Sequence, residues 1–150
     1  MKILIVTDAY YPQVNGVVRT LHETGEILKS QGQTIEYITP QQFLTVPMPK
    51  YNEIRLSLNV WPRVSNLINS IKPDAIHIAT EGPLGFMARR HCIKNGLKFT
   101  TSFHTRFDKY MKLYMPIIPA KWSEKFLCNF HNKAERLSLI HISEPTRHLF

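Results

Sequence analysis

Short apolar runs alternate along the chain with longer stretches of helical spacing. Four of the runs are rich in β-branched and aromatic residues, as strands buried on both faces are. They are residues 2–7 (KILIVT), 34–39 (TIEYIT), 75–79 (AIHIA) and 97–103 (LKFTTSF). Three longer stretches carry apolar residues at the spacing of a helix. They are residues 16–31, 61–72 and 83–95.

The ends of the predicted helices carry ordinary start and stop signals. Gly32 follows the first helix, Pro73 closes the second, and the third has Pro83 in its first turn and Gly96 after its last. The inward face of the first helix is predicted to be Val17, Val18, Leu21, Ile27 and Leu28. Residues 40–51 are Pro-rich and expected to be irregular, and residues 53–58 (EIRLSL) alternate like an outer strand.

This order of elements predicts an α/β fold, a doubly wound parallel Rossmann-like sheet with right-handed crossovers and helices on both faces. The chain has 150 residues, of which 43% are hydrophobic, so one domain with a real core is expected and a disordered chain is excluded. Two cysteines, Cys92 and Cys128, form no disulfide framework, which favours a reducing compartment.

The formal net charge is +8, from 19 Lys and Arg against 11 Asp and Glu. An excess of this size indicates an anionic partner, which leaves nucleic acid, an anionic membrane surface and a phosphorylated substrate as alternatives. The basic residues recur in small groups between Arg89 and Lys125 and are accompanied by no RNA-reading motif and no zinc-ligand spacing.

Ligands of open parallel sheets bind beyond the carboxyl ends of the strands, so the residues that follow each strand are the candidates for chemistry. Asn15-Gly16 opens the first helix, where backbone N–H groups can meet an anion, although no G-x-G-x-x-G fingerprint is present. Glu81 follows the third of these strands and His104 the fourth. The other histidines, His77 and His131 among them, give no comparable reason for a role in the site.

Three segments together, TDAYYPQVNGVVRTL, EGPLGFMARR and TSFHTRFDKY, resemble the amino-terminal domain of family 4 glycosyltransferases. These are retaining enzymes of the GT-B fold, and the resemblance is greatest to the branch of GDP-mannose-dependent α-mannosyltransferases and sulfoquinovosyl-diacylglycerol synthases. It extends from Met1 to about Arg136.

The resemblance implies roles for individual residues of this chain. Asn15, Gly16 and Val17 match the turn whose amides approach the donor diphosphate, and His104 matches the catalytic-site histidine beside the transferred sugar. Five further residues are expected to line the cleft and shape the acceptor site. They are Asp8, Arg19, Glu81, Thr105 and Tyr110.

The implied reaction is transfer of a hexose, with mannose the first choice, from a nucleotide sugar to a lipid or glycan acceptor. GDP-mannose is the expected co-substrate, and neither a metal ion nor another cofactor is expected. The implied location is cytoplasmic, with peripheral attachment to the inner face of the plasma membrane. A basic nucleic-acid-binding α/β module without catalysis is the alternative.

The last residues differ in character from the rest. Residues 137–147 (LSLIHISEPTR) resemble the translation of a DNA-sequencing adaptor, so residues 137–150 are expected to be a non-native tail. Residues 1–136 are then an incomplete, truncated amino-terminal half of a GT-B fold. Because the nucleotide-holding second domain is not in this stretch, we expect the chain alone to be inactive.

Overall fold

A computed structural model of the chain describes residues 1–11, 16–48, 51–103, 125, 128–134 and 136–139. Its centre is a five-stranded sheet in the order β2-β1-β5-β6-β7, in which every neighbouring pair is parallel. The strands of this sheet are β1 (Lys2–Val6), β2 (Thr34–Ile38), β5 (Ala75–Ile78), β6 (Thr100–Phe103) and β7 (Arg136–Leu139).

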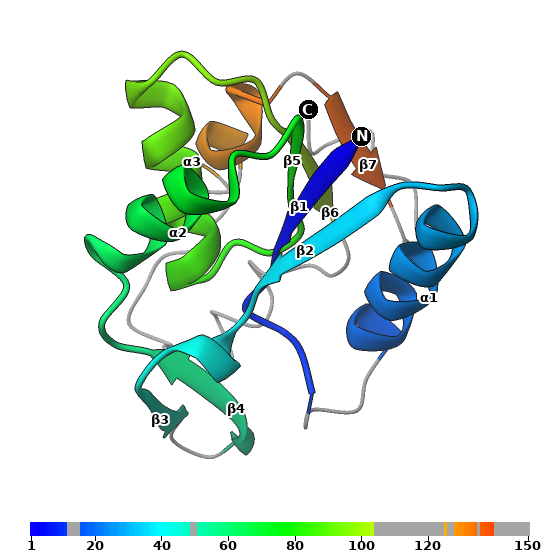
Figure 1. Ribbon diagram of the computed structural model, residues 1–150. Coiled ribbons are helices and arrows are strands. Elements are labelled where there is room, and N and C mark those ends of the chain that lie inside the picture. The colour runs from blue at the N-terminus through cyan, green and yellow to red at the C-terminus, as the bar shows by residue number, and fades with distance from the viewer. Residues whose placement is uncertain (12–15, 49–50, 104–124, 126–127, 135, 140–150) are drawn as a thin grey trace.

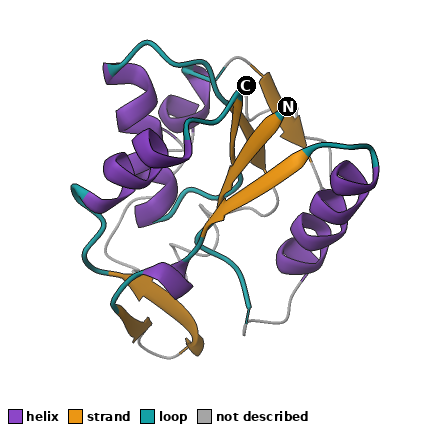
Figure 2. Cartoon of the chain, in the orientation of Figure 1, coloured by secondary structure: helices purple, strands orange, loops and turns teal. Residues whose placement is uncertain are grey.

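Helices cover the sheet on both faces (Figure 1). One face carries α1 (Gly16–Ser30), and the other carries α2 (Arg63–Ile71) and α3 (Pro83–Lys94). A further helical segment, residues 128–132, lies next to α3. The cartoon coloured by secondary structure shows the same layers (Figure 2). The predicted α/β fold with a parallel Rossmann-like sheet is therefore confirmed.

Alternation along β1 divides the core into two clusters. Leu4 and Val6 face α2 and α3 and are fully buried there with Ile76, Ile78 and Leu84. Ile5 points to the other face, and it packs in a smaller cluster below α1 with partners that include Leu21, Ile35 and Ala79. Strands that are apolar on both faces belong in the middle of a covered parallel sheet, as the sequence pattern predicts.

The first helix differs from its predicted inward face at one position. Ile27 is 58% exposed, because it lies on the outer side of α1. Gly25 is buried instead, and an added Cβ there would collide with the Tyr37 hydroxyl, so the glycine lets α1 approach β2 closely. The predicted inward residues Val18 and Leu21 are buried.

Two strand predictions need correction. The strand expected at residues 97–103 begins only at Thr100, and Leu97 is 41% exposed. The outer strand expected at residues 53–58 is β4 (Tyr51–Ser57), which belongs to a separate antiparallel hairpin with β3 (Thr45–Met48) and not to the main sheet. Thr45 ties the hairpin together by accepting hydrogen bonds from the Arg55 guanidinium.

The strand β7 was not predicted at all. It pairs in parallel with β6 in the register Thr100↔Arg136 to Phe103↔Leu139, so it crosses the expected domain end at Arg136. Residues 140–150 lie outside the described part of the chain. The boundary at Arg136 and the non-native tail stay predictions.

Candidate active site at the carboxyl edge of the sheet

Asp8 lies directly after β1 and joins three elements at the carboxyl edge of the sheet. Its backbone N–H donates to Thr80 Oγ1 at 2.7 Å, and the Thr80 hydroxyl donates to Asp8 Oδ2 at 2.7 Å. The carboxylate also accepts from the first-turn amides of α3, from Leu84 N at 2.8 Å and Gly85 N at 3.3 Å. Asp8 thus supplies the N-terminal cap of α3 from a distant part of the sequence.

Two glycines make this approach possible. A Cβ on Gly82 would collide with the Asp8 carboxyl group, and one on Gly85 would collide with the Thr80 carbonyl. Burial raises the pKa of the Asp8 carboxyl above its ordinary value, while the hydrogen bonds from Thr80, Leu84 and Gly85 act in the opposite direction. The predicted role of Asp8 in shaping the acceptor site stays a prediction, since its described contacts are all internal.

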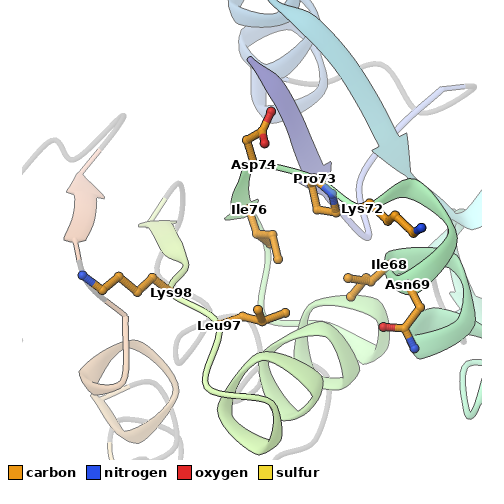
Figure 3. A pocket seen from close by; sticks show the side chains of 8 residues that line it. All are labelled: Ile68, Asn69, Lys72, Pro73, Asp74, Ile76, Leu97 and Lys98. Carbon is orange, nitrogen blue, oxygen red and sulfur yellow. The ribbon is translucent and has the colours of Figure 1, made fainter.

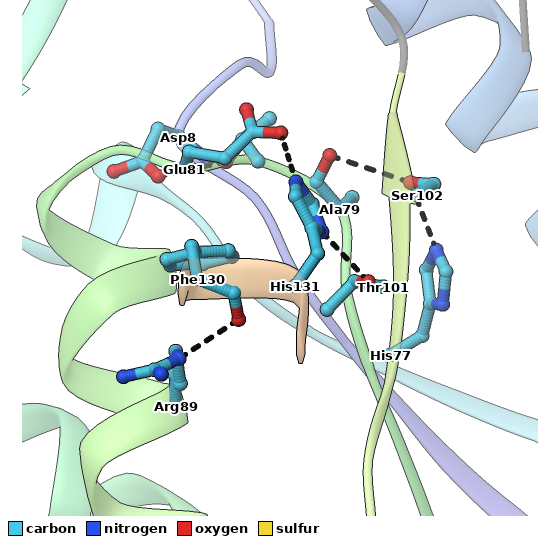
Figure 4. Close-up of polar contacts among 10 residues, drawn as sticks. Asp8, His77, Ala79, Glu81, Arg89, Thr101, Ser102, Phe130 and His131 are labelled. Carbon is cyan, nitrogen blue, oxygen red and sulfur yellow. Dashed lines mark hydrogen bonds and ion pairs between the residues drawn. The ribbon is translucent and has the colours of Figure 1, made fainter. Parts of the chain in front are cut away.

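Glu81 lies three residues after the end of β5. Its carboxylate is paired with a histidine for which the sequence offered no reason to expect a role in the site. Glu81 Oε1 lies 2.7 Å from His131 Nε2, and these side chains are only 8% and 1% exposed. The other ring nitrogen, His131 Nδ1, lies 2.8 Å from Thr101 Oγ1 on β6. Figure 4 shows the imidazole between the two partners.

The helical segment that carries His131 is fixed against α3 by Arg89. Arg89 Nε donates to the Phe130 carbonyl at 2.8 Å (Figure 4). A terminal nitrogen of the same guanidinium donates to the Asn129 carbonyl at 2.8 Å. The guanidinium also lies over the Phe130 ring, 5.6 Å from its centroid. Arg89 is therefore an internal anchor, and burial lowers its pKa.

The predicted diphosphate-binding turn is described from Gly16 onward. Gly16 is the first residue of α1 and is exposed, and an added Cβ there would meet nothing within 4 Å. Val17 packs partly against the smaller core cluster, and Arg19 is exposed one turn into the helix. Figure 1 shows the start of α1 at the same end of the sheet as the start of α3. The first turn of α1 contains no acidic residue that would repel an anion.

Four predicted site residues lie outside the described part of the chain. They are Asn15, His104, Thr105 and Tyr110. The described portion of β6 ends at Phe103, immediately before His104 in the sequence. Their roles stay predictions.

Two further side chains that could react, His77 and Cys92, are held or buried within the fold. His77 Nδ1 lies 2.7 Å from Thr100 Oγ1 and Nε2 lies 3.1 Å from Ser102 Oγ, and burial lowers the pKa of His77 to about 4. Burial raises the pKa of the Cys92 thiol to about 11, which makes it a poor nucleophile. Within the described ranges, no group of three or more His, Cys, Asp or Glu side chains is placed to hold a metal ion.

Comparison with known proteins agrees with this geometry. The profile of the family described as Glycosyltransferase Family 4 matches residues 14–149. The sulfoquinovosyl transferase SQD2 of Arabidopsis thaliana is 24% identical over 91% of this chain and 29% of its own length. The GDP-mannose-dependent alpha-mannosyltransferase of Corynebacterium glutamicum is 23% identical over 91% of this chain and 37% of its own. The alpha-monoglucosyldiacylglycerol synthase of Streptococcus pneumoniae is 22% identical over 74% and 28%.

No solved structure gives a significant match. The chain spans between 28% and 37% of the length of these three relatives. The family profile, in contrast, covers most of the chain, including α1, Glu81 and β6 but not β1 and Asp8. The protein belongs to glycosyltransferase family 4, and its parallel sheet with helices on both faces is a GT-B half domain.

Proposed function

We propose that this chain is the acceptor-side part of a retaining glycosyltransferase that moves a hexose, mannose before other sugars, from a nucleotide donor to a lipid or glycan acceptor. The observation that supports it best is that Asp8, Glu81 and the start of α1 lie at the same end of the sheet in a chain of family 4 (Figure 1). Open α/β sheets bind their ligands at this edge.

The donor diphosphate is proposed to rest on the exposed start of α1. The backbone N–H groups at the start of a helix and the positive end of its dipole attract a phosphate. Gly16 keeps the approach open, since it carries no side chain and nothing lies within 4 Å of the position that a Cβ would take.

This feature permits a clean test. Gly16→Val should reduce donor use strongly, because the new side chain would occupy the space that the diphosphate needs. The fold should be little affected, because an added Cβ at this position meets nothing within 4 Å. Kinetics with varied donor and a circular-dichroism melt of the same sample separate the two effects. Unchanged KM and kcat in a folded variant would remove the phosphate site.

His104 is proposed to contact the transferred sugar. A hydrogen-bonding imidazole there would stabilise the positive charge that develops on the sugar as the diphosphate leaves. The support for this role is its position in the sequence, immediately after Phe103 at the end of β6, since ligands of open parallel sheets bind beyond the carboxyl ends of the strands.

Donor and acceptor are proposed by analogy with the relatives. One relative is named as GDP-mannose-dependent, and the other two are named as a sulfoquinovosyl transferase and as a synthase of a glucosyldiacylglycerol. We therefore choose GDP-mannose as donor and a diacylglycerol-type lipid as the first acceptor to examine.

The decisive experiment uses the full-length transferase in which this segment is joined to its second domain. Incubation with GDP-mannose or UDP-glucose and a lipid acceptor should yield a glycolipid whose anomeric configuration, read by NMR, matches that of the donor. The 150-residue chain alone should give no product, because it spans only 28% to 37% of the length of the transferases and the synthase that it matches. Inverted product, or turnover by the chain alone, would contradict the proposal.

Peripheral attachment to an anionic membrane is proposed from the charge of +8. No helix in the described ranges is long and apolar enough to cross a bilayer. Arg89 is half-buried, and its guanidinium is bonded to the Phe130 and Asn129 carbonyls. Sedimentation with vesicles tests this: binding should rise with anionic lipid content and fall with salt, and equal pelleting with neutral vesicles would contradict it.

A further inference from the structure

The relay formed by Glu81, His131 and Thr101 connects three segments that are far apart in the sequence. Its two polar contacts measure 2.7 Å and 2.8 Å, and they span 50 and 30 residues of sequence. The Thr101 residue is fully buried, and the His131 and Glu81 side chains are 1% and 8% exposed. The relay therefore lies inside the protein and directly below the carboxyl edge.

Burying an imidazole and a carboxylate together is a costly way to hold a fold. Replacing a buried polar pair by apolar side chains of similar volume is often neutral or stabilising. The relay differs from a simple packing contact in that it fixes orientation: one ring nitrogen meets Glu81 and the other meets Thr101. A carboxylate accepts only, so Nε2 carries the proton, and in the neutral ring Nδ1 then accepts from the Thr101 hydroxyl.

Each end of the relay contacts a segment of the carboxyl edge, where the candidate active site lies. Glu81 belongs to the turn that Asp8 holds from the opposite side through Thr80. Thr101 lies on β6, three residues before His104. The ring of His131 is itself held in place, because Arg89 fixes the backbone of the neighbouring Phe130.

We propose that His131 is a positioning residue for sugar transfer. Through Glu81 and Thr101, it fixes the position of the turn at residues 80–82 relative to the end of β6. This inference rests on the proposed function. In this proposal, His131 contacts neither the sugar nor the diphosphate. It acts by holding the turn at residues 80–82 and the end of β6 at the separation that the reacting groups need.

Two substitutions separate the two halves of the relay. The amide of glutamine reaches the position of Nε2, so His131→Gln keeps a donor for Glu81, while the shorter His131→Asn keeps a partner only for Thr101. In the full-length transferase, His131→Asn should lower kcat about 100-fold with donor KM within about threefold, since small misplacements near reacting groups cost about this much. The kcat of His131→Gln should be at least about tenfold higher than that of His131→Asn.

His91→Gln is the matched control. His91 is also a buried histidine, 6% exposed, but it lies on α3 near Asn95 and away from the relay. It should leave kcat and KM at their wild-type values even where it lowers the melting temperature. If His131→Asn does not fold, Thr101→Val removes the hydroxyl with little change of shape and should still lower kcat.

The outcomes are distinct. Wild-type kcat in folded His131→Asn and Thr101→Val, or an equal loss in His91→Gln, would overturn the positioning role while the transferase activity stands. Absence of hexose transfer by the wild-type full-length protein would instead contradict the proposed function and remove this inference with it.

Discussion

The two edges of the parallel sheet differ in how their polar side chains are arranged. At the carboxyl edge, Asp8 and Glu81 are each held by short contacts to another element, to Thr80 and the start of α3 in one case and to His131 in the other. At the amino edge, a cavity of about 430 Å³ opens between the ends of α2 and α3. Its lining residues are Ile68, Asn69, Lys72, Pro73, Asp74, Ile76, Leu97 and Lys98.

The amino-edge cavity is large enough for a ligand, but the charged side chains that line it do not point toward a common position. Lys72 and Lys98 extend in opposite directions from its apolar floor (Figure 3). Asp74 turns its carboxylate to the start of β1, where Oδ2 accepts from Lys2 N at 2.7 Å. A cavity whose charged groups diverge is a poor binding site, whereas polar groups that converge at strand ends are what a reaction needs.

The largest expected difference between the edges is in stability. Asp8→Ala removes the acceptor for the Thr80 hydroxyl and for two amides of α3, so the free energy of unfolding should fall by about 3 kcal/mol, as expected when hydrogen bonds to a charged group are lost. Asp74→Ala, at the amino edge, removes an exposed contact and should cost less than about 1 kcal/mol. Urea unfolding measures the loss of unfolding free energy in each variant. Equal losses in Asp8→Ala and Asp74→Ala would contradict the difference between the two edges.

His77 lies between the two edges, on the opposite face of β6 from His131. Its contribution to the free energy of unfolding depends on pH. Its pKa is about 4 in the folded protein, so between that value and the ordinary 6.5 the unfolded chain binds more protons. Stability should therefore rise with pH across this window and be lost as the pH falls. A shift from 6.5 to about 4 corresponds to a contribution on the order of 3 kcal/mol.

His77→Gln should remove this part of the pH dependence. Carboxylates titrate in the same range, so the quantity to compare is the difference in unfolding free energy between wild type and variant at pH 7 and pH 4. A difference that does not change with pH would show that the ring is not held neutral by burial.

The smallest expected effect is at the end of α2. Lys72 has φ 52°, in the left-handed region that side chains disfavour. Lys72→Gly should raise the free energy of unfolding by about 0.5–1 kcal/mol, since relief of the left-handed conformation outweighs the added freedom of glycine in the unfolded chain. The same variant removes one charge from the amino-edge cavity and should leave hexose transfer unchanged. Lower activity would give that cavity a role after all.

The local pattern of apolar residues was sufficient to predict most strands of the sheet and its helices. The runs at residues 2–7, 34–39 and 75–79 are strands to within one residue of their predicted ends, because continuous apolar character specifies burial on both faces. The hairpin was missed in part because Pro47 interrupts β3 and hides its alternation.

The candidate site was less accessible to sequence reasoning. Glu81 was selected because it follows a strand, but its partner His131 lies 50 residues away on a helical segment and carries no local signal. Asp8 was selected for the cleft, and the structure shows it capping α3, a role that depends on the close approach allowed by Gly82 and Gly85. Contacts of this kind arise from the fold and not from any single segment.

The central claim is that the carboxyl edge carries out sugar transfer. The most direct measurement is the single-turnover rate of hexose transfer from GDP-mannose by the full-length enzyme, for wild type, His104→Ala and the amino-edge control Asp74→Ala. His104→Ala should be slower by about 10²–10³, the usual cost of losing one charge-stabilising contact, while Asp74→Ala should match wild type. A near-normal rate for His104→Ala, or an equal loss for Asp74→Ala, would contradict the claim.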